Sequence, residues 1–164
     1  MKLLKLFIPA LAILALAQGC TKEYITNYNG AQVYARDFTV KPADWKRNQG
    51  DNNPGFDNYL YADFDDPDIT QKAVDNGTVQ AFIYVIYDSA NNLGSWNPLP
   101  FAYPLELQED DGSGNKTIVI VPEVTRMEYN EGRVTFIIQD LDGYDPEDMI
   151  TSVTIRVTVV KNLR

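Results

Sequence analysis

The sequence predicts an all-β fold, an antiparallel β-sandwich of about eight strands with one or two short helices. Three observations support this fold class. Short segments of alternating apolar and polar residues recur along the chain, with turns rich in Gly, Asn and Asp between them. Tyr and Phe, which favour strands, number ten and seven. Residues 130–132, Asn-Glu-Gly, connect two alternating segments as a hairpin turn.

The expected strands differ in how they should be covered. Thr78–Tyr87 is apolar on both faces, which predicts a central strand. Pro100 and Pro104 confine the next strand to a sheet edge. The last strand alternates and should have one solvated face. The predicted strands are Ala31–Val40, Tyr59–Phe64, Thr78–Tyr87, Phe101–Leu107, Thr117–Val121, Val124–Tyr129, Arg133–Gln139 and Val153–Val159.

Two short helices are expected. Asp68 can cap a helix over Ile69–Asn76, and Gly77 follows its end. The segment Asp145–Met149 begins with an N-cap residue and has a proline at the first helical position.

The N-terminus has the parts of an export signal. Lys2 and Lys5 precede a 12-residue apolar run, Leu6–Ala17, and small residues follow. The run is too short to cross a bilayer, which takes about 20 apolar residues. We therefore divide the chain into a signal peptide over residues 1–19, a tether over residues 20–30 and a β-sandwich domain over residues 31–164.

Residues 17–20, Ala-Gln-Gly-Cys, resemble the lipobox of bacterial lipoproteins, in which the cysteine receives the lipid and becomes the first residue. Cys20 is the sole cysteine and is our lipidation site. The alternative is ordinary cleavage after residues 15–17, Ala-Leu-Ala. A lipid-anchored protein of the outer membrane is expected, facing the periplasm or the cell surface. Lys22-Glu23 partly resembles the surface-export signal of Bacteroidota lipoproteins, which favours the outward side.

Composition excludes several functions. Without Lys2 and Lys5, 12 basic and 23 acidic residues remain, a net charge of −11 (12 − 23), which disfavours nucleic-acid binding. The chain has no histidine, so His-based triads and the usual zinc sites are excluded. No catalytic motif is evident, and we expect no enzyme and no cofactor other than calcium at one loop.

Two kinds of candidate site remain. Asp140, Asp142 and Asp145 could supply oxygen ligands to calcium, although the spacing is not that of an EF-hand and a solvated loop explains them as well. Trp45 and Trp96 lie in turn-like settings and could stack on sugars, or fold back as core. A second acidic cluster, from Asp63 to Asp68, is interpreted as a solvated loop.

Several short motifs are spread from Val33 to Val160. They are Asp44-Trp45, the stretch from Asp66 to Thr70, Asn76-Gly77, residues 98–100, Glu128-Tyr129, Gly132, residues 134–136 and residues 155–158. With these motifs the chain resembles a family of small Bacteroidota lipoproteins, some of which carry the domain after collagen-like repeats. The resemblance implies the fold and location given above and no assigned activity.

Three functions are consistent with these observations. The first is a lipid-anchored module for binding, adhesion or assembly with protein partners. The second is an accessory subunit that captures glycans for an envelope complex. The third is a carboxylate-based hydrolase, which needs two facing carboxyl groups in a cleft. A complex subunit should expose an apolar patch, and a glycan binder should expose aromatic rings in a concave site.

Overall fold

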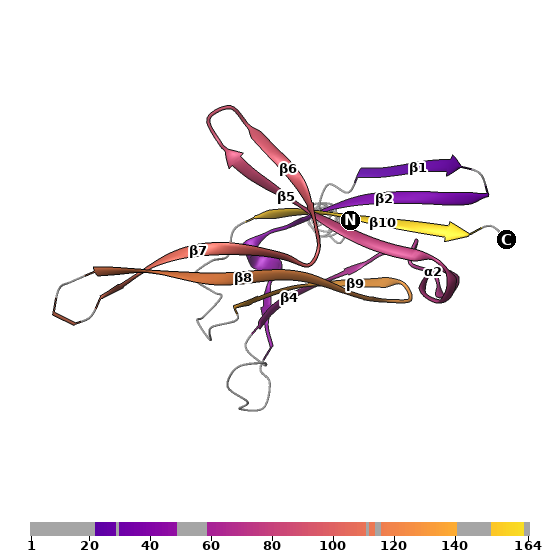
Figure 1. The fold of residues 1–164 in the computed structure, drawn as a ribbon. Coiled ribbons are helices and arrows are strands. Elements are labelled where there is room, and N and C mark those ends of the chain that lie inside the picture. The colour runs from indigo at the N-terminus through magenta and orange to yellow at the C-terminus, as the bar shows by residue number, and fades with distance from the viewer. Residues whose placement is uncertain are drawn as a thin grey trace, which may run out of the picture.

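The predicted all-β sandwich is confirmed. The computed structural model describes residues 22–28, 30–48, 59–110, 112–113, 116–140 and 152–162. They form two antiparallel sheets of five strands, which pack face to face (Figure 1). Sheet A has the order β1-β2-β10-β5-β6, and sheet B has the order β3-β4-β9-β8-β7.

The strands of sheet A are β1 (Lys22–Tyr28), β2 (Ala31–Val40), β10 (Val153–Asn162), β5 (Thr78–Asp88) and β6 (Leu93–Pro98). Those of sheet B are β3 (Lys46–Arg47), β4 (Tyr59–Asp65), β9 (Arg133–Asp140), β8 (Lys116–Asn130) and β7 (Phe101–Asp110). A 3₁₀ turn, η1 (Pro42–Asp44), precedes β3, and the helix α2 (Gln71–Asn76) connects β4 to β5.

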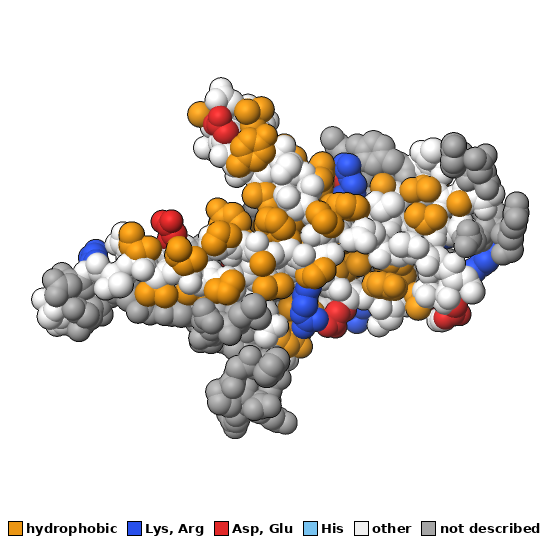
Figure 2. Space-filling model, in the orientation of Figure 1, with side chains coloured by type: hydrophobic (Ala, Val, Ile, Leu, Met, Phe, Trp, Pro, Cys, Tyr) orange, Lys and Arg blue, Asp and Glu red, His pale blue; other side chains and the backbone are white. Residues whose placement is uncertain are grey.

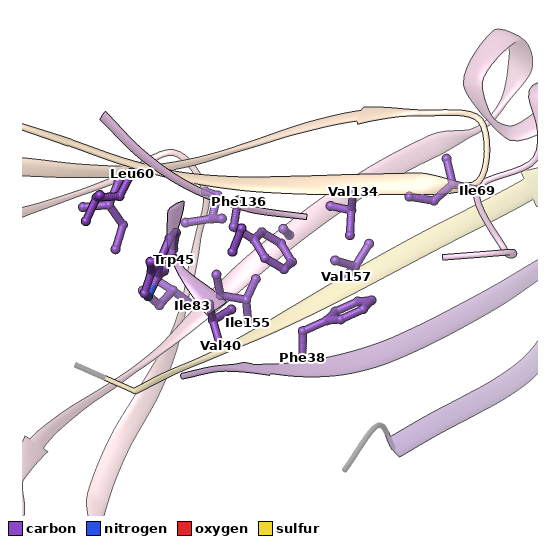
Figure 3. Packing of buried hydrophobic residues seen from close by; sticks show 14 of the residues in the cluster. Phe38, Val40, Trp45, Leu60, Ile69, Ile83, Val134, Phe136, Ile155 and Val157 are labelled. Atoms are coloured by element: carbon purple, nitrogen blue, oxygen red, sulfur yellow. The ribbon is translucent and has the colours of Figure 1, made fainter. Parts of the chain in front are cut away.

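The core lies between the sheets, and aromatic rings fill its middle. Phe38 of β2, Phe64 of β4 and Phe136 of β9 have ring centres 5.3 to 5.8 Å apart. Ile155 and Val157 of β10 are buried beside them (Figure 3). The expected alternation of β10 therefore holds, with its apolar face turned toward sheet B.

One long strand replaces two predicted ones. The sequence predicts a break at Pro122, but β8 runs through it. The pairing of β8 with β9 begins only at Glu123, so Pro122 lies where β8 has β7 as its neighbour and no described strand on the other side. Pro122 has no backbone N–H to donate, and a strand position with one open side tolerates this.

Three strands were not predicted, one of them the two-residue β3. Residues 22–28, expected to be tether, form β1, which pairs residue for residue with β2. This segment contains the strand-favouring Ile25 and Thr26, and a sheet edge satisfies its backbone groups on one side. Residues 93–98, expected to be a turn, form β6, in which Gly94 leaves room for the Tyr84 ring.

The helix is confirmed, but its predicted cap is wrong. Thr70, and not Asp68, accepts the hydrogen bond from the backbone N–H of Ala73. Asp68 instead pairs with Arg36 and Lys161. Gly77 follows α2 as expected and donates its N–H to the Ala73 carbonyl. The second predicted helix, 145–149, lies outside the described residues.

Two hairpins extend beyond the sandwich. The described pairing of β5 with β10 stops at Tyr84, so the rest of β5 pairs with β6 alone. Before Glu123, β8 pairs with β7 alone. We call residues 85–95 the β5–β6 arm and residues 104–122 the β7–β8 arm. The two arms diverge from the end of the sandwich that lies opposite α2 (Figure 1).

Candidate functional site

A cavity of about 390 Å³ lies at the point where the two arms diverge. Its lining comes from both sheets and is mostly apolar or aromatic. The lining residues are Ile83, Tyr84, Val85, Ile86, Phe101, Tyr103, Glu123, Thr125, Ser152 and Val153. We call this cavity the arm groove. Its size falls in the range of small-ligand and peptide sites.

The strand register explains why these residues meet. Phe101 lies directly opposite Thr125, and Tyr103 lies opposite Glu123, so two alternate β7–β8 pairs, which share a face, form the sheet B wall. Ile83 and Val153 belong to the sheet A wall. At this point β5 is no longer paired with β10, and β8 is no longer paired with β9. The apolar inner faces of the two sheets therefore separate instead of covering each other. The arm groove is therefore an open end of the hydrophobic core.

Apolar side chains are also exposed farther out on both arms. Ile86, Tyr87 and Leu93 are exposed on the β5–β6 arm, by 52%, 69% and 48%. Ile118 and Ile120 are exposed on the β7–β8 arm, on the face of β8 opposite to Glu123 and Thr125. Figure 2 shows apolar side chains along the β7–β8 arm and around the junction of the arms. Large exposed apolar side chains that gather in this way mark an interaction surface.

The described lining of the arm groove lacks the pair of carboxyl groups that acid-type glycoside hydrolysis uses. Glu123 is the single carboxylate among the described lining residues, and hydroxyl groups come from Thr125, Ser152 and the two tyrosines. Glycoside hydrolysis by acids requires two carboxyl groups that face each other. Within the described parts of the chain, no group of three acidic or Cys side chains is arranged to hold a metal ion.

Trp45 is part of the core. Only 8% of the residue is exposed, and it packs beside Val40, Leu60 and Ile83 (Figure 3). Its Nε1–H has no hydrogen-bond partner among the described residues. A buried ring is not available to stack on a sugar, so this ligand-binding candidate is removed.

Trp96 lies on the outer face of sheet A and is half-buried. The guanidinium carbon of Arg156 is 4.2 Å from the Trp96 ring centre, and the Tyr84 ring centre is 5.1 Å away. Arg156 also forms a two-pronged ion pair with Asp37, at 2.7 and 2.9 Å. One face of the indole is therefore covered by a fixed cation, and this contact gives Trp96 a structural role.

The acidic cluster at residues 63–68 is not the solvated loop expected. Asp66 is 1% exposed and accepts the backbone N–H of Asp68 at 3.1 Å. Burial raises the pKa of Asp66, while that hydrogen bond and the positive charge of Arg36 act in the opposite direction. Asp68 also pairs with Lys161. These contacts join the end of β4 to sheet A, which is a structural role.

The other predicted site residues lie outside the described residues or at their boundary. Cys20, Asp142 and Asp145 lie outside the described residues, and Asp140 is described only as the last backbone position of β9. None of the described helices has the length and apolarity needed to span a bilayer.

Sequence reasoning did not identify Phe101, Tyr103 and Glu123 as site residues. A partial signal was present, because Pro100, Pro104 and Pro122 mark strands with an open side. Comparisons of the chain with protein-family models, curated proteins and solved structures found no match.

Proposed function

We propose that this chain is a lipid-anchored envelope protein whose β-sandwich binds a protein partner through the arm groove, in adhesion or assembly. The observation that carries the proposal is the apolar cavity between two diverging hairpins, on which Ile86, Tyr87, Ile118 and Ile120 are exposed. Hairpins that only completed the fold would turn such side chains inward, because leaving them in water costs about 25 cal/mol per Å².

Anchoring through Cys20 is the second half of the proposal. It is supported by the lipobox-like residues 17–20 and by the position of the sole cysteine after an apolar run. Two or more acyl chains would hold the domain stably at the outer membrane. Cys20→Ser should abolish labelling with a fatty-acid analogue, and unchanged labelling would refute this half.

Affinity capture from intact membranes, with a tag at the C-terminus, tests the binding half. The wild-type chain should recover a partner, and Tyr103→Lys should lose it, because a charge then enters the arm groove. Ile25→Lys is the matched control, since Ile25 is exposed by 58% and Tyr103 by 47%, and Ile25 lies on β1. Recovery of a lone monomer by the wild-type chain would contradict partner binding.

A second candidate is glycan capture, favoured by the aromatic Phe101 and Tyr103 in a concave site. The same variants separate it from protein binding if the captured material is analysed for carbohydrate. Binding of purified envelope glycan that Tyr103→Lys abolishes would support this candidate.

A further inference from the structure

We infer that the arm groove accepts an extended, apolar strand from a partner protein, with basic residues at the ends of that strand. The inference rests on the proposed function and names the class of partner. It follows from three features of the arms, which are their open edges, their apolar walls and their charge.

The open edges favour an extended occupant. β6 is the last strand of sheet A and β7 the last strand of sheet B. Each pairs with a single described neighbour, so its outer row of N–H and C=O groups has no strand partner among the described residues. An added strand satisfies such a row with main-chain hydrogen bonds, whereas a helix satisfies its own backbone groups internally.

The apolar walls favour alternate apolar side chains in the occupant. A bound strand directs every second side chain to the same face. Val85 and Tyr103 lie on opposite walls of the arm groove, and the buried core residue Ile83 lies at its inner end. Alternate apolar side chains can enter this space, while the polar ones between them stay in solvent.

The charge of the arms favours basic residues in the occupant and disfavours a second copy of this chain. Between Tyr84 and Val124 the sequence has six acidic residues and one basic residue, and the whole chain has a net charge of −9. Complementary charges increase association, and like charges oppose it. The six acidic residues are Asp88, Glu106, Glu109, Asp110, Asp111 and Glu123, and the basic one is Lys116.

A synthetic peptide tests the inference directly. The probe alternates valine and threonine over about nine residues, a usual strand length, and has two lysines at each end. One control peptide ends in glutamates, and another has serine in place of valine. Fluorescence anisotropy with the full chain should show binding of the lysine-ended probe, weakened about tenfold or more in both controls. Binding should also weaken as salt is added.

Variants of the chain test whether the peptide binds in the arm groove. Tyr103→Lys should weaken binding of the lysine-ended probe about tenfold or more, and Ile25→Lys should leave it unchanged. Tyr103→Ser, which removes the ring without adding charge, should weaken binding by a smaller factor. Circular dichroism checks that each variant is folded. Equal binding of all three peptides, or no effect of either Tyr103 variant, overturns the inference.

Other occupants give different results. Concentration-dependent dimers in sedimentation, lost in Tyr103→Lys, would replace the partner strand with a second copy. Binding of oligosaccharides but no peptide would replace it with a glycan. If membranes yield a protein partner that Tyr103→Lys loses while no peptide binds, the proposed function stands and the strand inference fails. If membranes yield no protein partner and no peptide binds, the proposed function and the strand inference both fail.

Discussion

Arg156 of β10 lies over the ring of Trp96 on β6, with its guanidinium carbon 4.2 Å from the ring centre. The same guanidinium reaches Asp37 of β2 through two hydrogen bonds. Arg156 therefore links three strands of sheet A on its solvent side, and it does so next to the β5–β6 arm. A planar, forked cation is needed for both contacts.

We predict that Arg156→Lys lowers the free energy of unfolding by about 1 to 2 kcal/mol, because the ammonium group cannot keep the forked pair and the ring contact together. Chemical denaturation measures the change. Arg133→Lys is the control, since the Arg133 side chain is 52% exposed and contacts Asp63 at the surface. An equal effect of the two substitutions would contradict the predicted role of Arg156.

Phe136→Ala should lower the free energy of unfolding by about 3 to 5 kcal/mol, because the ring is fully buried between Phe38 and Phe64. Ile120→Ala, at a side chain that is 62% exposed, should change it by less than about 0.5 kcal/mol. Thermal or chemical unfolding distinguishes the two. A large loss in Ile120→Ala would mean that the arms serve folding and would weaken the proposed binding role.

Gly77→Ala should destabilise the fold by about 1 to 3 kcal/mol. A Cβ at this position would lie 2.5 Å from the Val160 carbonyl oxygen and 2.6 Å from that of Ala73, and both are backbone atoms. The end of α2 would therefore have to move away from β10. Lys72→Ala, on the exposed side of the same helix, should be nearly neutral in the same unfolding assay.

Asp66→Asn should change how stability depends on pH. Burial raises the pKa of Asp66 in the folded state above the unfolded value of 3.8. Ionised Asp66 therefore opposes folding above the raised pKa, and this penalty disappears as pH falls below the unfolded pKa, where both states are protonated.

The asparagine variant has no such penalty at any pH. The free energy of unfolding of the variant, minus that of the wild type, should therefore be larger at pH 7 than at pH 3.5. Denaturation of both chains at the two pH values tests this. The expectation fails if the difference is the same at both pH values, or if it has the opposite sign.

The sandwich itself could be predicted because alternation and turn chemistry are local properties. Ile155 and Val157 share a face in any strand, and Gly132 permits the hairpin turn whatever surrounds it. Pro104 correctly indicated an edge strand. The β1 strand could not be predicted, since a segment with weak alternation is ordered by pairing with β2, and such pairing is non-local.

The candidate site was harder to predict for the same reason. Phe101 and Tyr103 look like ordinary strand residues in the sequence, and only the loss of neighbouring strands brings them to an opening. Trp45 and Trp96 drew attention as rare aromatic residues beside polar ones. One is buried and the other is covered by Arg156, and no local pattern distinguishes these outcomes from an exposed ring.

The start of β1 at Lys22 has a consequence for how the protein would sit on a membrane. On the proposal that Cys20 carries the lipid, a single residue separates it from the first paired residue, Lys22, a reach of about 7 Å at most. β1 and β6 occupy opposite edges of sheet A, four strand spacings or about 19 Å apart. The bilayer would then lie near the start of β1, at the opposite edge of sheet A from β6. The anchor would restrict the orientation of the domain as well as its location.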